Sequence, residues 1–549
     1  MSLKPKPNYP IPEETQRVAQ AAFSKGNVYV RVVDAMGTLY HDEQFADLFP
    51  CRGQPAASPA RLALVTVLQY AEGLSDRQAA DAVRGRIDWK YVLGLELTDT
   101  GFDHTVLSEF RSRLAAGDAA FRLLESLLAV ADENGLVKTR GRQRTDSTHV
   151  LAAVRVLNRL ERVGETLRAA LNTLAVVAPE WLQALAPSDW YERYNRRVEN
   201  YHLPKSEQKR QALAATIGTD GFQLLDAIDN DSDLPWLAEV PVVKTLRRVW
   251  EEQYTIVKGK PEWKKIKTMS SPATLTASPY DPEARYTTKR STSWVGYKVH
   301  LTETCDDDTP NLITHVLTTP ATTPDNNQVA VIHSALAKRR RLPTEHLVDK
   351  GYTDAHELVS SRRDYGVTLI GPVSNDPSWQ ARANEGYDKS HFHFDWERQV
   401  ATCPSGKQNL SWLKSTYPQN GTVWEVRFSR KDCTPCVHRP RCTRSKKEPR
   451  IVGLQSREHH EALQHARAYQ TTETFQKKYA ARAGIEATHE QAIRRSGLRQ
   501  SRYIGLDKTR LQHLATAAAT NLVRLGEWLA GTPKAKTRCS HFAALQMAA

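Results

Sequence analysis

The sequence lacks the features of membrane and secreted proteins. It contains no run of 18 apolar residues, and its polar, proline-rich beginning is unlike a signal peptide. We therefore expect a cytoplasmic protein, where thiols stay reduced, so the seven cysteines do not predict a disulfide framework. No internal repeat of fixed period is present.

The length and the net charge of the chain narrow the class of protein further. A chain of 549 residues has room for about three or four domains, and 40% hydrophobic residues can form a sizeable core. Lys and Arg exceed Asp and Glu by 76 to 62, which gives a net charge of +14. This excess suits a phosphate-bearing partner such as DNA, although it can also serve solubility alone.

Residues 12–135 have the pattern of short amphipathic helices. Ser58 and Pro59 are typical of a helix start, and Ser75 with Gln78 forms a capping-box pattern. Exposed arginines among short helices are typical of helix-turn-helix DNA-binding modules. A plain helical packing domain would have the same pattern.

Acidic residues accompany two predicted strands. Asp146 lies within the strand-like segment 142–152, and Asp349 directly follows the apolar segment 346–348. A strand aspartate is costly to bury without a metal ion or a hydrogen-bond donor. Open α/β sheets place their chemistry at the carboxyl ends of strands. The long helix-rich stretch after the first strand is interpreted as an insertion.

Residues 479–495 are predicted to form one helix. Tyr479, Arg482, Glu486 and Glu490 would share one face of it. This pattern alone favours a solvated helix with ion pairs along one face. Because the segment follows two predicted strands that carry aspartates, we interpret this helix face as part of a functional site instead.

Asp146, Asp349 and Glu486 come from separate predicted elements. Three such carboxylates can converge on two magnesium ions, which prefer oxygen ligands. Paired ions can activate a water or a 3′-hydroxyl and stabilise the leaving oxygen in a displacement at phosphorus.

These segments resemble the catalytic blocks of DDE transposases from bacterial insertion sequences. The resemblance rests on TDST around Asp146, on VDKGYTD around Asp349, and on the spacing of Tyr479, Arg482 and Glu486. The chain is most similar to the IS four and IS five superfamily, and within it to the IS eleven-eighty-two type. The N-terminal helices and the segment after the glutamate helix also resemble this group, so the similarity covers most of the chain.

The resemblance implies an α/β fold with an RNase H-like catalytic core. Asp146, Asp349 and Glu486 would be the catalytic residues and would bind two Mg²⁺ or Mn²⁺ ions. The expected reaction is cleavage at the ends of the element by metal-dependent hydrolysis, followed by joining to target DNA. The partners would be the terminal inverted repeats and the target DNA.

The resemblance also assigns contacts to the DNA phosphate near the scissile bond. Tyr479 and Arg482 would make them. The family pattern continues with a lysine where this chain has Ile493, so Arg494 is the expected substitute. Glu490 is a rival for the third carboxylate by position, but the spacing from Tyr479 and Arg482 favours Glu486.

Four cysteines in one segment predict a structural zinc site. Cys433, Cys436 and Cys442 follow one another closely, and Cys403 lies thirty residues earlier in a CPSG turn. Four thiolates suit tetrahedral zinc and would stabilise a small β-rich segment. His438 is an alternative ligand, and a set of free thiols is the alternative interpretation.

The cysteine segment is also basic and contains Trp396, Trp412 and Trp424. Cations suit DNA phosphates, and exposed rings suit an unstacked base. Tryptophan on strands is more often a core residue. Related transposases carry an insertion at this place that contacts the transposon end.

The predicted organisation has seven segments. They are a helical DNA-binding or dimerisation region (1–135), the first strands of the core (136–155), a helical insertion (156–283), the continued core (284–374), a basic four-cysteine β-rich insertion (375–450), the catalytic and C-terminal helices (451–530) and a flexible tail (531–549).

The sequence and its resemblance together predict a transposase that acts at the bacterial nucleoid, without a membrane partner. A homodimer or larger synaptic complex is expected because two transposon ends must be held together. Two alternatives stay open. One is a metal-dependent DNA nuclease with the same core that does not join ends, and the other is an inactive DNA-binding relative.

Overall fold

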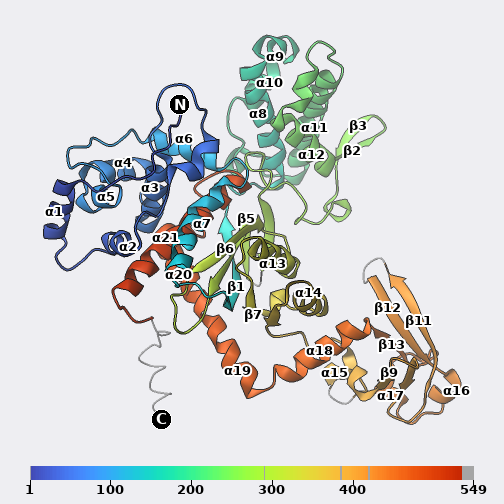
Figure 1. Ribbon diagram of the computed structural model, residues 1–549. Helices are drawn as coiled ribbons and strands as arrows, with labels where there is room; N and C mark the ends of the chain where they lie inside the picture. Colours follow the sequence, from blue (N-terminus) through green and yellow to red (C-terminus); the bar gives the residue numbers. More distant parts are fainter. Residues whose placement is uncertain (1, 290, 384–385, 418–420, 535–549) are drawn as a thin grey trace.

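The protein is a mixed α/β structure built around one six-stranded sheet (Figure 1). The computed structural model describes residues 2–289, 291–383, 386–417 and 421–534. Most of the predicted flexible tail, from residue 535 on, lies outside the described residues. None of the helices in the described residues has the length and apolarity that crossing a membrane requires.

The central sheet confirms the predicted strands around both aspartates. Its members are β1 (Arg140–Leu151), β4 (Arg285–Lys289), β5 (Thr292–Thr304), β6 (Ile313–Pro320), β7 (Pro343–Val348) and β8 (Thr368–Ile370). Strand β1 lies between β5, which is antiparallel to it, and β7, which is parallel. Strand β8 continues the parallel side, while β6 and β4 pair antiparallel with the other edge of β5. Residues more than a hundred positions apart thus become neighbours in the sheet.

The N-terminal region is helical, as predicted. Its helices are α1 (Glu13–Ala22), α2 (Val28–Met36), α3 (Pro59–Glu72), α4 (Asp76–Gly85), α5 (Ile87–Val92), α6 (Thr105–Leu114) and α7 (Arg122–Glu133). Ser58 caps α3, and Ser75 with Gln78 forms the expected capping box of α4. The long helix α21 (Leu506–Leu529) packs against α2, α3, α7 and β6. One core therefore joins the N-terminal helices, the sheet and α21.

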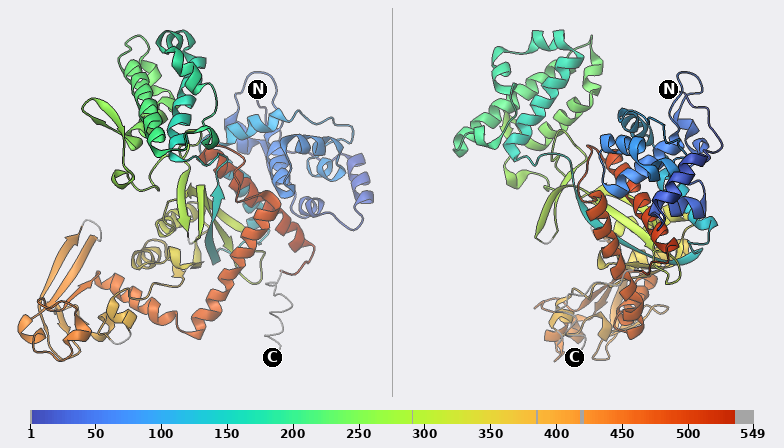
Figure 2. Two further views of the ribbon diagram at one scale, coloured as in Figure 1. Left: turned by 180° about the vertical axis from the view of Figure 1, so that it is seen from behind. Right: turned by 90° about the vertical axis from the view of Figure 1, so that its left-hand side faces the viewer.

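The stretch between β1 and β4 forms a separate helical insertion. It contains α8 (Arg159–Val177), α9 (Pro179–Leu185), α10 (Ser188–Tyr194), α11 (Glu207–Asp229) and α12 (Pro241–Gln253), followed by the hairpin β2 (Tyr254–Val257) and β3 (Lys260–Trp263). Its buried apolar residues form a core of their own. Figure 2 shows the helical insertion on the opposite side of the sheet from the cysteine-bearing insertion.

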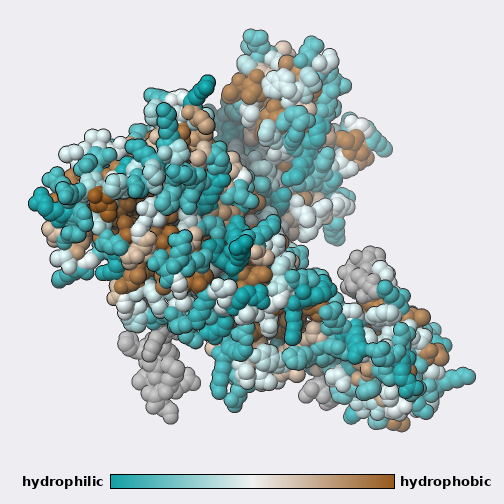
Figure 3. All heavy atoms as spheres, viewed as in Figure 1, coloured by the Kyte–Doolittle hydropathy of each residue, from teal (hydrophilic) through white to brown (hydrophobic). Residues whose placement is uncertain are grey.

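The cysteine-bearing insertion is a small β-rich unit on a helical arm (Figure 1). Its elements are α15 (Trp379–Ala383), β9 (His393–Asp395), β10 (Val400–Thr402), β11 (Asn409–Tyr417), β12 (Gly421–Phe428), α16 (Arg430–Cys433), α17 (Arg439–Cys442) and β13 (Ile451–Leu454). The arm consists of α18 (Arg457–Tyr469) and α19 (Glu473–Tyr479), and α18 contacts α14 (Ala355–Tyr365) beside the sheet. The face of the insertion visible in Figure 3 is largely hydrophilic.

One detail of this insertion differs from the strand-like alternation of residues 392–403 in the sequence, and another agrees with the prediction that tryptophans on strands are core residues. The segment 392–403 is a pair of short antiparallel strands and not one strand, because the chain reverses at Gln399, which has a φ of 52°. Trp412 is buried in the core of the insertion, with the ring of Trp396 5.3 Å away and Trp424 packed against that core. These rings therefore serve as core residues.

A test of the packing in the helical insertion is Gly221→Ala. A Cβ at Gly221 would lie 2.2 Å from the ring of Trp250, so the added methyl group forces the two helices apart. We expect the opening free energy of α11 and α12 to fall by about 1–3 kcal/mol. Native-state hydrogen exchange measures this change. Thr219→Ala on the exposed side of α11 is the control, and an equal loss there would contradict the explanation.

Candidate active site

Asp146 and Asp349 lie side by side, just beyond the last residues that β1 and β7 pair. The parallel ladder pairs Thr145 with Val348, and the next residue on each segment is one of the two aspartates. Asp146 accepts a hydrogen bond from the backbone N–H of Ser147, and Asp349 accepts one from that of Gly351. The fold thus brings together two carboxylates that are far apart in the sequence.

The third carboxylate, Glu486, lies on α20 (Gly484–Ser496). The helix predicted over 479–495 is confirmed except at Ala480–Ala483, which form a 3-10 turn between α19, which ends at Tyr479, and α20. At this turn the carbonyl of Ala481 accepts a hydrogen bond from the guanidinium of Arg144 on β1. The same guanidinium occupies the space that a side chain on Gly484 would need. These contacts hold the 3-10 turn against strand β1.

Arg482 connects the strand carboxylate to the helix carboxylate. Its guanidinium donates to Asp146 at 2.8 Å and to Glu486 at 3.1 Å. The side chains of Arg482 and Asp146 are about 15% and 14% exposed, whereas that of Glu486 is 67% exposed. Burial raises the pKa of Asp146 to about 6, with Asp349 adding to the rise and Arg482 opposing it. The protonated form of Asp146 is thus favoured mainly by its burial.

Tyr479 lies against the same group of charges. Its ring stacks on Phe475, with 5.2 Å between the ring centroids. Burial raises the pKa of the phenol, and the negative charges of Asp349, Asp146 and Glu486 raise it further, while Arg482 opposes the shift. A tyrosine, an arginine and three carboxylates therefore share one electrostatic environment.

The structure places the other predicted helix residues elsewhere. Arg494 donates to Glu490 at 2.6 Å on the exposed side of α20. Ile493, at the position of the family's lysine, packs against the core shared with the N-terminal helices. Glu490 is thus engaged by Arg494, whereas Glu486 is engaged by Arg482.

A buried carboxylate that sequence reasoning missed anchors α20 to the sheet. Glu303 on β5 is 0% exposed and accepts from Arg144, Thr488 and Arg524, each at 2.7 Å. These four residues, called the Glu303 network below, join β5, β1, α20 and α21. A charged residue inside an apolar strand was the available signal in the sequence.

Asp325 is the second residue that sequence reasoning missed. The helix α13 (Val329–Lys338) follows it, after a 3-10 turn at Asn326–Gln328. Asp325 forms an ion pair with Lys298 of β5 at 2.6 Å and accepts a hydrogen bond from Ser147 at 3.3 Å. It therefore borders the segment that carries Asp146.

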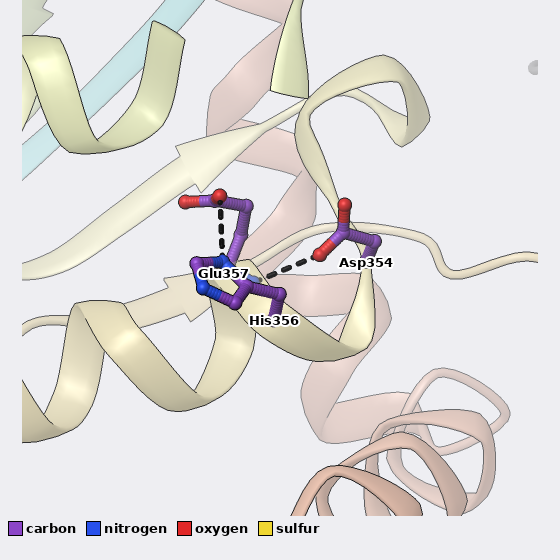
Figure 4. A group of neighbouring side chains, drawn as sticks. All are labelled: Asp354, His356 and Glu357. Carbon is purple, nitrogen blue, oxygen red and sulfur yellow. Dashed lines mark hydrogen bonds and ion pairs between the residues drawn. The ribbon is translucent and has the colours of Figure 1, made fainter. Parts of the chain in front are cut away.

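A further cluster of metal-binding residue types lies at the start of α14 (Figure 4). Among the described residues, Asp354, His356 and Glu357 form the group whose ligand atoms lie within 4.8 Å of one another. Asp354 already caps the helix by accepting from the N–H of Glu357. The buried oxygen of Glu357 that has no hydrogen-bond partner points away from the other two residues in Figure 4. The group is explained as a helix cap.

The four predicted zinc ligands all lie in the cysteine-bearing insertion, but no three of their sulfur atoms are grouped within 4.8 Å of one another. Cys403 follows β10, Cys433 and Cys436 lie at and after the end of α16, and Cys442 ends α17. Burial raises the pKa of the Cys442 thiol to about 11, and the charges of the other three cysteines raise it further, while Arg450 opposes the rise. The cysteines are thus close enough to influence one another.

The Glu303 network gives a testable stability prediction. Glu303→Ala leaves the guanidinium groups of Arg144 and Arg524 buried without their shared partner. We expect a loss of about 3–5 kcal/mol in the free energy of unfolding of the core, measured by denaturant titration. Glu490→Ala removes an exposed ion pair on α20 and should cost at most about 1 kcal/mol. Equal losses in the two variants would show that burial of the network is unimportant.

Comparisons with known proteins bear on two parts of the chain. Residues 402–526 match the family described as "Transposase DDE domain", and residues 17–113 match "Transposase domain (DUF772)". The first match includes Glu486 and the four predicted zinc ligands, whereas Asp146 and Asp349 precede it. Neither the curated proteins nor the solved structures compared with the chain gave a match. Two separate segments of this chain are thus similar to transposase domains, one of them to a DDE domain.

Proposed function

We propose that the protein is a DDE transposase. It would bind the terminal inverted repeats of its insertion sequence, cleave the DNA ends by metal-dependent phosphodiester hydrolysis and join them to target DNA. The observation that carries this proposal is Arg482, which contacts both Asp146 and Glu486 beside Asp349. The matches of two segments to transposase domains support it independently.

The strand arrangement supports an RNase H-like core. Three antiparallel strands, β6, β5 and β1, are followed by the parallel strands β7 and β8. The first strand in the chain is the middle of this sheet and carries the first carboxylate. The second follows the parallel neighbour, which is where such sheets place their chemistry.

The donor chemistry of the site fits divalent ions such as Mg²⁺ or Mn²⁺. Asp146, Asp349 and Glu486 offer oxygen ligands only, which hard cations prefer. The raised pKa of Asp146 reflects its burial and the nearby charge of Asp349, and a bound cation would relieve that repulsion. The three carboxylates are not gathered within 4.8 Å of one another, so ligation would draw them together.

Each residue of the site has a distinct proposed task. Asp146 and Asp349 would hold the ions from the sheet, and Glu486 would hold them from α20. Tyr479 and Arg482 would hold the phosphate next to the scissile bond, with the guanidinium supplying two donors in a planar fork. The ions would supply an activated water or 3′-hydroxyl and charge stabilisation at the leaving oxygen. Arg494 would contact phosphate farther along the helix, on the exposed side.

The cysteine-bearing insertion is proposed as a zinc-stabilised DNA contact. Cys403, Cys433, Cys436 and Cys442 would bind one structural Zn²⁺, since four protein thiolates leave no open position. Exposed cations nearby would contact the backbone of the transposon end. They are Lys431, Arg441, Arg444, Lys446 and Lys447. A homodimer or larger assembly would hold the two transposon ends together.

The catalytic proposal is tested by cleavage of a labelled duplex that carries the element's own end. Asp349→Ala should lower the rate by at least about 1,000-fold, because it removes a metal ligand. Glu490→Gln, which changes an exposed carboxylate on the same helix as Glu486, should cleave like the wild type. Cleavage by Asp349→Ala at the wild-type rate would refute the assignment.

The same assay separates a transposase from a nuclease with the same core. A transposase transfers the labelled 3′ end into an added target duplex, whereas a nuclease releases it. Binding without cleavage by the wild type would favour an inactive DNA-binding relative.

Zinc is tested by elemental analysis of the purified protein. We expect about one zinc per chain, lost in Cys436→Ser because three thiolates bind the ion far more weakly than four. Cys51→Ser, which changes an exposed cysteine outside the insertion, should keep the zinc. A wild-type protein free of zinc would refute the site.

A further inference from the structure

An ion pair lies directly behind the proposed metal site. Lys298 on β5 and Asp325, just before α13, are joined at 2.6 Å, and their side chains are 10% and 9% exposed. The ammonium group of Lys298 also donates to the carbonyl of Thr323. The carboxylate of Asp325 is thus fixed in position from its own loop and from the sheet.

The free side of this carboxylate faces both segments that carry the strand aspartates. The oxygen Oδ2 accepts from Ser147, the residue after Asp146. A Cβ on Gly351 would lie 3.0 Å from Oδ1 of Asp349 and 3.3 Å from Oδ2 of Asp325. The two carboxylates therefore flank one backbone position in the turn after β7.

We propose that Asp325, held by Lys298, is a positioning residue that fixes Asp146 and Asp349 relative to each other. This inference rests on the proposed function, because it treats the two aspartates as metal ligands. The register shows where support is needed: the ladder between β1 and β7 ends at Thr145 and Val348, so Asp146 stays paired with β5 but strand pairing no longer ties it to Asp349. Beyond that point the Asp325 carboxylate accepts a hydrogen bond from Ser147 and lies beside Gly351.

The charge of Asp325 matters as well as its place. Lys298 and, at 3.7 Å, Lys289 are the cations beside it. Without Asp325, Lys298 would present an unpaired ammonium group next to the site and would oppose binding of a divalent cation. Groups that orient metal ligands in this way typically change metal affinity about 10- to 100-fold when removed.

The test is Mn²⁺ binding to the full-length protein without DNA, measured by titration calorimetry. The part of the binding that Asp349→Ala abolishes defines the site. Asp325→Asn keeps the shape of the side chain and removes its charge, and we expect the affinity of that site to fall by about tenfold or more. Ser147→Ala keeps the ion pair and loses only one hydrogen bond, so a smaller fall of about 2- to 10-fold is expected.

The matched control is Asp220→Asn in the helical insertion. Asp220 is also buried, at 7% exposure, and is bonded to Arg193 and Tyr194. Both asparagine variants should lower the melting temperature, but only Asp325→Asn should weaken Mn²⁺ binding. Unchanged Mn²⁺ affinity in Asp325→Asn, or equal weakening in both variants, would overturn the inference.

The Mn²⁺-binding test and the DNA-cleavage test can fail independently, so their outcomes can be distinguished. A wild-type protein whose Mn²⁺ binding depends on Asp349 and Asp325, but which cleaves no DNA, would refute only the proposed reaction. A wild-type protein without Mn²⁺ binding that depends on Asp349 would overturn this inference too.

Discussion

The buried charge of Glu303 is the constraint on which the core depends. A fully buried carboxylate is stable only when donors surround it, and the Glu303 network supplies them from strand β1, helix α20 and helix α21. Because these partners come from separate parts of the chain, satisfying one charge sets the relative position of three elements. The helix that carries Glu486 is therefore placed by a residue that takes no part in the proposed chemistry.

The residues of the proposed site lie on elements that are held in the fold in different ways. Asp146 lies within a paired strand, Asp349 follows the end of one, and Glu486 is on an exposed helix face after a 3-10 turn. Arg482 spans the first and last of these. Supporting groups lie at two places: Arg144 contacts the 3-10 turn before α20, and Asp325 contacts Ser147 beside Asp146.

The sequence predicts the elements of this structure better than their connections. Helix caps such as Ser58, and the strands around the two aspartates, follow from local patterns, and the structure confirms them. The contact of the 3-10 turn before α20 with Arg144 could not be predicted, because the two lie more than three hundred residues apart in the sequence. Asp325 has the local pattern of a helix start, and only the folded sheet places it beside Ser147. Long-range contacts of this kind leave no periodic signal.

The position of α21 has a consequence for synthesis of the chain. The helical insertion has a core made only of its own residues and can fold as soon as it leaves the ribosome. The N-terminal helices and the sheet instead share their core with α21, which begins at Leu506. A chain released before that point exposes the apolar faces that α21 covers. Full-length translation is therefore a condition for a folded core, and truncated products would be substrates for proteolysis.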